Sequence, residues 1–369
     1  MPGDPRDAIA LGPPSVLSAW AFDLLRDACD LVPERAAIQI IDRQDKLEPG
    51  GDRGPLIYLS HYPSASLLAE CGNKRAPILL CLDDPVESVR CLREAASVSV
   101  VEALRQQTAA AASYAELSSH PRLLILHRHV AARASEVIDV VLKHFRIELT
   151  SAQREALHTK RLGPKGKEAD LESSLKACAP GYAAPGEAET RFSAKEVAMI
   201  GGVLAPLLEM SFRADAGPIV WPIEAFLSGD RPDTPATLVA ELTGAARILY
   251  YGPYFYLPAG SWRARMMVGF SEGAKRTPFS VEVFAGQSLL AIATMVPEDR
   301  GVYHATFEFA HEDAAKAVEV RVRSDRGAIE GQIALGNVEF TREAIPEAEG
   351  VRTPEGRAMQ NRVKRLGGR

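Results

Sequence analysis

The chain has 369 residues, of which 46% are hydrophobic and 25% charged, and its formal net charge is −5. This composition is ordinary for a globular protein, the length suits two or three domains, and the acidic balance argues against a nucleic-acid surface, which needs clustered positive charge. The N-terminus has no basic segment followed by an apolar core, and no apolar run approaches about 18 residues. We therefore expect no secretory signal, no membrane span and a cytoplasmic location.

The five cysteines are odd in number and scattered through mostly apolar segments. They lack the spacing of a zinc site, so we expect reduced thiols and no bound metal.

The first part of the chain alternates short apolar runs with amphipathic segments. Continuous apolar runs are typical of parallel strands buried on both faces, and the segments after them have helical periodicity. This alternation predicts an α/β domain with a three-layer, doubly wound parallel sheet, whose ligands lie beyond the carboxyl ends of the strands. The expected strands are 36–41, 55–60, 77–82 and 123–126; the expected helices follow Ser15 and cover 87–112, 131–145 and 193–210.

The second part of the chain changes to a period of two. Val318, Val320 and Val322, for example, alternate with charged residues. About eight such strands between turn residues predict an antiparallel β-sandwich of jelly-roll type. We therefore divide the chain into an α/β domain (1–212), a proline-containing linker (213–235), a β-sandwich (236–343) and a basic tail (344–369) that we expect to be disordered.

Residues 54–70 form a candidate anion site, because an apolar strand leads into a small-residue turn and a helix start. Ser64 and Ser66 could cap that helix, whose N-terminal amides favour an anion. His61, at the end of the strand, could be a general base, although a structural histidine is the alternative. Arg133 could reach an anionic ligand or form a surface salt bridge.

Several short motifs between residues 54 and 212 resemble the sulfotransferase family. The quoted stretches are YPSASLL (62–68), LDDPVESV (82–89), the strand and helix from 123 to 147, and LAPLL (204–208). The resemblance implies that the donor PAPS is held by a loop at 62–68 and by an arginine and a serine of the second motif.

The chain departs from this family at the residues that bind the donor. Leu67 and Leu68 stand where the family has hydroxyls, Asp83 stands where it has the arginine, and Cys91 stands where it has the serine. Leucine cannot donate a hydrogen bond, and a carboxylate repels a phosphate. These losses favour a non-catalytic domain over an active enzyme. Asp83 and Asp84 could instead bind magnesium, but capping of the next helix is the favoured interpretation.

Residues 250–258 concentrate much of the chain's aromatic content. Flat rings with polar tips suit sugars, so Tyr251, Tyr254, Tyr256 and Trp262 are candidate carbohydrate-binding residues. The pattern GPY…LPAG-W-R also resembles β-sandwich modules attached to bacterial surface-polysaccharide enzymes. A purely structural sandwich is the alternative.

Together these observations predict a non-catalytic or regulatory sulfotransferase-like protein that acts with carbohydrate in a bacterial surface-glycan pathway. One alternative is an active sulfotransferase, or other group transferase, that uses PAPS with His61 as base and Ser64 and Ser66 on the donor. Another is a structural protein that forms oligomers. The expected partner is a glycan, with a protein partner or second copy left open, and no cofactor is expected unless the transferase alternative holds.

Overall fold

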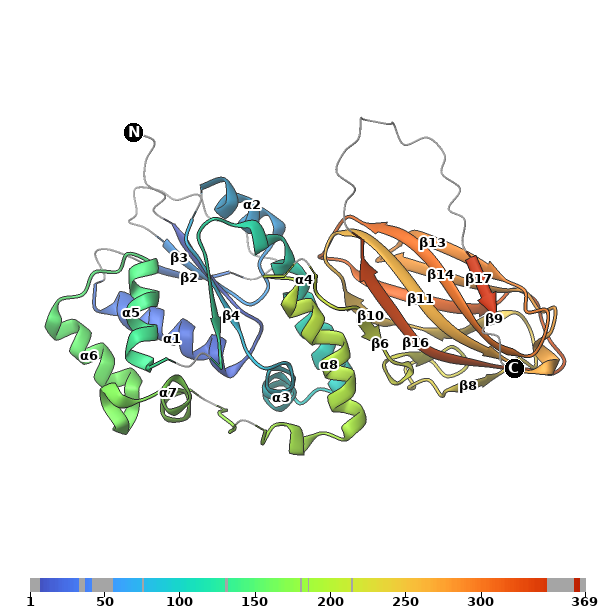
Figure 1. The fold of residues 1–369 in the computed structure, drawn as a ribbon, viewed down its shortest axis with the longest axis horizontal. Coiled ribbons are helices and arrows are strands. Elements are labelled where there is room, and N and C mark those ends of the chain that lie inside the picture. Colours follow the sequence, from blue (N-terminus) through green and yellow to red (C-terminus); the bar gives the residue numbers. More distant parts are fainter. Residues whose placement is uncertain are drawn as a thin grey trace. The chain divides into compact units, whose positions relative to one another are not determined.

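The computed structural model describes residues 7–32, 37–41, 56–74, 76–129, 132–179, 181–184, 186–213, 215–343 and 362–365. The chain divides into two compact units (Figure 1). The first, called here the α/β unit, comprises Met1–Ile200 and Met210–Arg213, and the second, called the β unit, comprises Gly201–Glu209 and Ala214–Arg369. Among the described residues, no helix has the length and apolar character needed to cross a membrane.

The α/β unit is built on a five-stranded parallel sheet in the order β2-β3-β1-β4-β5. This confirms the expected α/β class. The central strand β1 was not predicted, because it has only four residues, two of them alanine. The strands are β1 (Ala8–Leu11), β2 (Ala37–Ile40), β3 (Leu56–Ser60), β4 (Ile78–Leu82) and β5 (Leu123–His127).

Helices cover both faces of this sheet, with α1 and α5 on one side and α3 and α4 on the other (Figure 1). The predicted single helix 87–112 is wrong: Ser97 adopts a left-handed φ of 53°, and Ser99 starts a new helix by accepting a hydrogen bond from the Glu102 amide. The helices are α1 (Val16–Asp30), α2 (Ala65–Lys74), α3 (Pro85–Ala96), α4 (Val100–Tyr114), α5 (Ala134–His144), α6 (Ser151–Leu162), α7 (Leu171–Cys178) and α8 (Ala194–Glu209).

The β unit contains two antiparallel sheets. In the β12–β15 sheet the order is β13-β12-β15-β9-β7, with β10 on β15; in the β11–β14 sheet it is β17-β14-β11-β16-β6, with β8 on β16. Their alternating apolar residues are buried, as the period of two predicted. The strands are β6 (Ile219–Trp221), β7 (Leu227–Ser228), β8 (Val239–Glu241), β9 (Arg247–Tyr251), β10 (Pro253–Tyr256), β11 (Gly260–Phe270), β12 (Phe279–Ala285), β13 (Ser288–Met295), β14 (Gly301–His311), β15 (Ala317–Ser324), β16 (Gln332–Arg342) and β17 (Arg362–Arg365).

Two expectations about the ends of the sandwich are wrong. Residues 213–235 are not simply a linker, because β6 pairs with β16 and β7 pairs with β9, and Trp221 of β6 is fully buried against Phe255 and Phe340. The expected disorder of 344–369 also fails at β17, which pairs with β14. Residues 344–361 and 366–369 lie outside the described residues.

Candidate functional site

The turn between β1 and α1 occupies the position where a doubly wound sheet holds a phosphate. Strand β1 lies between β3 and β4, and the chain leaves it through Gly12 and Ser15 into α1. Ligands of such sheets bind at the carboxyl ends of adjacent central strands, in front of the first helix. This turn is therefore a second candidate anion site, besides the predicted stretch 54–70. The sequence signal was present in the short apolar run 8–11, followed by Gly-Pro-Pro-Ser.

The turn is closed by its own atoms. Ser15 caps α1, since its Oγ accepts a hydrogen bond from the Ser18 amide at 3.1 Å, and the Ser18 hydroxyl donates to the Pro13 carbonyl at 2.8 Å. A Cβ on Gly12 would lie 2.3 Å from the Ser18 Oγ and 2.9 Å from the Cys81 carbonyl oxygen. Only glycine allows the chain to pass so close to its neighbours. The two serine hydroxyls of the turn are therefore used within the protein.

A carboxylate of the protein itself lies at the N-terminus of α1. The Asp83 side chain, at the end of β4, is 0% exposed. Its Oδ2 accepts a hydrogen bond from the Leu17 amide at 3.0 Å, and its Oδ1 accepts one from the Asp84 amide at 2.9 Å. Helix amides at this position favour an anion, and here that anion is Asp83. Burial raises the pKa of this carboxyl above its usual value, although Arg128 and the two amides favour the ionised form and act in the opposite direction.

Arg128, at the end of β5, balances this buried charge. Its Nη1 lies 3.5 Å from Asp83 Oδ1, and its Nε and Nη2 donate to Glu172 at 3.1 and 2.6 Å. The segment 181–184 covers it, because the Ala183 carbonyl accepts from Nη2 at 2.7 Å and the Tyr182 ring lies 5.6 Å from the guanidinium. Only 2% of the arginine side chain is exposed. The ends of β4 and β5 are thus filled by ion pairs of the chain.

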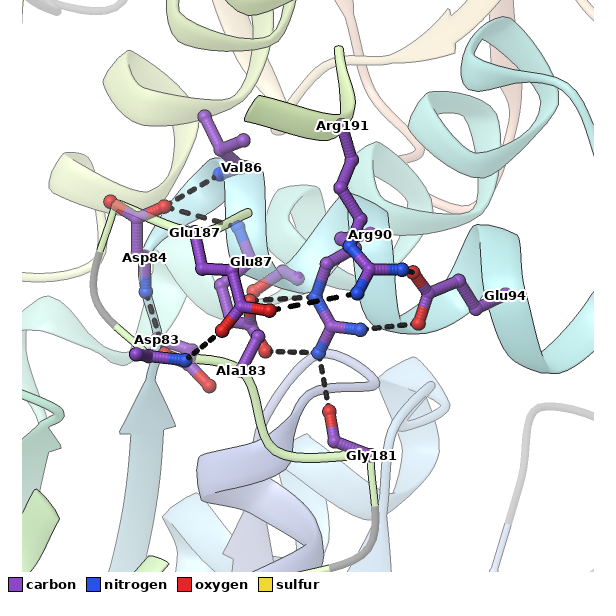
Figure 2. Close-up of polar contacts among 12 residues, drawn as sticks. Asp83, Asp84, Val86, Glu87, Arg90, Glu94, Gly181, Ala183, Glu187 and Arg191 are labelled. Carbon is purple, nitrogen blue, oxygen red and sulfur yellow. Dashed lines mark hydrogen bonds and ion pairs between the residues drawn. The ribbon is translucent and has the colours of Figure 1, made fainter. Parts of the chain in front are cut away.

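A second buried arginine extends this cluster along α3 (Figure 2). Arg90 donates to Glu87 from Nε at 2.9 Å and from Nη2 at 2.5 Å, and it also contacts Glu94 and the Gly181 carbonyl. Each carboxylate in this cluster therefore has a guanidinium partner. The buried donors are therefore committed within the chain.

The predicted anion-site residues near the end of β3 make contacts within the chain. His61 Nδ1 lies 2.7 Å from the Gly12 carbonyl oxygen, so the ring donates to the turn and packs against Phe22. Ser64 caps α2 as predicted: its Oγ accepts from the Leu67 amide at 3.2 Å and lies 2.9 Å from the Ser66 Oγ. Leu67 is fully buried in the core.

Arg133 and Asp84 have local roles. Arg133 precedes α5, and its largely exposed guanidinium lies 3.6 Å from Glu168. Asp84 caps α3 by accepting from the Val86 and Glu87 amides at 2.9 and 3.1 Å, which confirms the capping interpretation. Within the described ranges, no group of three or more His, Cys, Asp or Glu residues could hold a metal ion.

The second candidate site is on the outer face of the β12–β15 sheet. Val318, Val320 and Val322 are buried, so the alternate residues Glu319 and Arg321 point to the other face. Arg321 donates to Glu319 from Nε at 2.8 Å and from Nη2 at 2.7 Å. Strand register places Phe284 opposite Glu319, and the Arg321 guanidinium lies 4.2 Å from the Phe284 ring centroid.

Two of the predicted tyrosines border this pair. The rings of Tyr251 and Tyr254 are 6.3 Å apart at an angle of 72°, and the Tyr254 hydroxyl donates to Glu319 at 3.0 Å. Burial and the adjacent Glu319 raise the pKa of Tyr254 to about 12, so the hydroxyl keeps its proton. Tyr254 has a φ of +67°, a strained conformation for a bulky residue that is enriched at functional sites.

The other two predicted aromatic residues differ in exposure. Tyr256 is half-buried and alternates with the fully buried Phe255, so it shares the outward side of β10 with Tyr254. Trp262 is 0% exposed, and its indole N–H donates to the Pro258 carbonyl at 3.0 Å. Its assignment as a sugar-binding residue is therefore corrected, because the ring is part of the core. Sequence reasoning missed Phe284, Glu319 and Arg321, whose proximity depends on strand register.

No family model matches the chain, and no curated protein matches it by sequence. Among solved structures, the chain is similar to mouse sulfotransferase SULT7A1 complexed with PAP, at 9% identity and a TM-score of 0.37, over 57% of this chain and 84% of that one. It is also similar to the carbohydrate-binding module CBM36 in complex with calcium and xylotriose (11% identity, TM-score 0.24, 33% of this chain and 98% of that one). A third neighbour is the xylan-binding module CBM15 (14% identity, TM-score 0.25, 34% and 97%). Likenesses this distant carry no functional assignment, which rests on the geometry.

Proposed function

We propose that the protein binds carbohydrate through its β unit, in a bacterial surface-glycan pathway, and that its α/β unit is a non-catalytic, sulfotransferase-like domain with a regulatory or positioning role. The observation that carries this proposal is the outer face of the β12–β15 sheet. There, the partly exposed rings of Tyr251 and Tyr254 border the hydrogen-bonded pair of Glu319 and Arg321.

This face has the chemistry that a sugar requires. A sugar ring presents an apolar C–H face and a polar rim of hydroxyls, and aromatic rings beside fixed polar groups complement both. Tyr254 is held by its hydrogen bond to Glu319, and Arg321 by two. Because these side chains are already ordered, binding costs little conformational entropy.

The α/β unit supports a non-catalytic role. The carboxylate of Asp83 already accepts the hydrogen bond of the Leu17 amide at the start of α1. A donor phosphate at that position would lie against this buried charge. Like charges at contact cost several kcal/mol. We therefore infer that PAPS is not a ligand of this turn, and that sulfate transfer is not the function of the unit.

The carbohydrate half is tested with the full chain on an oligosaccharide array, followed by calorimetry on each hit. The double variant Tyr251→Ala/Tyr254→Ala should weaken binding at least tenfold, because two ring contacts at about 1 kcal/mol each are lost. Tyr62→Ala, which truncates a half-buried tyrosine of the α/β unit, is the matched control and should bind as the wild type does. Unchanged binding by the double variant, or no binding by the wild type, would contradict the proposal.

The non-catalytic half is tested by calorimetry with PAPS and PAP at millimolar concentration, where no heat of binding is expected. Micromolar binding together with transfer of sulfate to a sugar would overturn it and favour the transferase alternative. In that case His61→Ala should abolish turnover. An assembly larger than a monomer in light scattering, with no response on the array, would favour a structural role.

A further inference from the structure

The charged side chains on the outer face of the β12–β15 sheet form a closed set. Besides the Glu319–Arg321 pair, Arg323 lies 3.4 Å from Glu282 and 3.1 Å from Asp325. These residues comprise three carboxylates and two guanidinium groups. Every positive charge of the set is therefore already paired, and one negative charge is in excess.

Arg321 is the member of this set that is best placed to contact a ligand. Its Nε and Nη2 are fixed by Glu319, and its plane lies over the Phe284 ring. Among the described residues, no hydrogen bond is found for its Nη1, and 31% of the side chain is exposed. A guanidinium fixed along one edge and stacked on a ring is a pre-organised donor along its other edge.

We propose that this face selects neutral glycans over anionic ones, and that Arg321 is the specificity-determining residue, donating from Nη1 to a sugar hydroxyl. The proposal rests on the carbohydrate binding proposed above. A neutral hydroxyl can accept from Nη1 while Glu319 keeps both of its hydrogen bonds from Arg321. A sulfate or uronate group would compete with Glu319 for Arg321 and meet the excess negative charge, which is a repulsive arrangement.

The strand register indicates an oligosaccharide rather than a single sugar. A row of side chains crosses the sheet from Tyr254 on β10, beside Glu319, to Phe284 on β12 and Leu289 on β13. Three strand spacings of about 4.8 Å make the row roughly 14 Å long. Leu289 is 51% exposed at its far end. Apolar contacts at both ends with the polar pair between them suit a chain of several sugar rings.

The test uses the full chain on an array that carries neutral oligosaccharides together with the sulfated and uronic-acid counterpart of each. Wild-type protein should bind neutral members about tenfold more tightly than their anionic counterparts. Arg321→Gln should weaken neutral binding about tenfold. Glu319→Gln, which removes the excess charge and frees Arg321, should raise affinity for the sulfated counterpart about tenfold.

The β11–β14 sheet provides control variants, because Arg263 and Glu308 form a more exposed arginine–glutamate pair at 3.2 Å on its outer face. Arg263→Gln and Glu308→Gln should leave the neutral-to-anionic ratio unchanged. Equal or tighter binding of anionic members by the wild type would overturn the neutral preference and leave carbohydrate binding intact. An unchanged ratio in both Arg321→Gln and Glu319→Gln would overturn the role of Arg321, and no binding to any member would overturn the proposed function as well.

Discussion

Asp83 in the α/β unit and Glu319 in the β unit are both buried carboxylates with an arginine partner, but the two arginines differ in exposure. Arg128, beside Asp83, is 2% exposed, and the segment 181–184 covers it. Arg321, beside Glu319, is 31% exposed. The α/β pair is therefore closed to a ligand, whereas the β pair can offer a donor to one.

This difference shows that a buried ion pair does not by itself mark a binding site. Burying two charges costs several kcal/mol, which their attraction repays only when the remaining hydrogen-bonding groups are satisfied. In the α/β unit, backbone groups such as the Leu17 amide and the Ala183 carbonyl form hydrogen bonds with the remaining polar atoms of the pair. In the β unit, part of the guanidinium still faces solvent, where water or a sugar hydroxyl can satisfy it.

The largest predicted effect is that of Asp83→Ala. This substitution leaves Arg128 and the Leu17 amide without their carboxylate, and breaking a buried pair typically costs about 3–5 kcal/mol. We expect an equivalent loss in the free energy of unfolding of the α/β unit, measured by hydrogen exchange of the α1 amides.

The control for this prediction is Glu102→Ala, which breaks an exposed pair with Arg105 and should cost less than about 0.5 kcal/mol. If Asp83→Ala lowered the free energy of unfolding as little as Glu102→Ala does, the contrast between the closed and the open pair would not hold.

A smaller effect is predicted for Phe284→Ala, which removes the ring under Arg321. Stacking of this kind contributes about 1 kcal/mol, so affinity for a neutral oligosaccharide should fall about fivefold in calorimetry. Phe212→Ala, at an exposed phenylalanine of the α/β unit, is the matched control. An unchanged affinity in Phe284→Ala would mean that the ring does not hold the guanidinium for binding.

Strands of both units could be predicted from the sequence where the signal is local. The continuous apolar run of β4 indicated a strand buried on both faces, and the alternation in β15 showed which side of that strand is buried. Ser64 and Asp84 were predicted correctly as helix caps, because capping depends only on the next few amides.

The sites were harder to predict because they depend on long-range pairing. The run Ala8–Leu11 is a weak strand by composition, and it becomes the central strand only through pairing with β3 and β4. The sequence therefore indicated only 54–70 as an anion site, and not the turn after β1. In the same way, Phe284 lies opposite Glu319 through a register that joins distant segments. Trp262 is different, because its alternation with Arg263 and Arg265 already indicated the core side, and that signal was not used.

His311 on β14 is a third buried polar group. Because it lies without a close ion pair, it tests how much burial alone lowers the free energy of unfolding. It is 2% exposed, and no hydrogen-bond partner for its Nε2 is found among the described residues. Burial lowers the pKa of this imidazole, although the charge of Asp313 and a hydrogen bond with the Leu257 backbone act in the opposite direction. The unfolded chain therefore binds the proton first as the pH falls.

Stability should accordingly be complete above about pH 6.5 and decrease below it, by at most about 1.4 kcal/mol per pH unit from this residue. His311→Phe should reduce the slope of unfolding free energy against pH in urea titrations of the β unit. His129→Phe, at an exposed histidine of the α/β unit, is the control and should retain that slope. An equal slope in the His311 variant would show that burial of this ring is not costly.

The smallest effect is predicted for Arg133→Ala. The sequence made Arg133 a candidate anion-binding residue, but its guanidinium is 59% exposed and lies 3.6 Å from Glu168, which is itself 78% exposed. Exposed pairs of this kind contribute about 0–1 kcal/mol, so we expect a change of less than about 0.5 kcal/mol in unfolding and no change in any ligand affinity. Glu168→Ala should behave in the same way. A loss of anion or glycan binding in Arg133→Ala alone would show that the α/β unit has an open charged site. The proposed difference, in which the α/β unit is closed to a ligand and the β unit is open to one, would then be wrong.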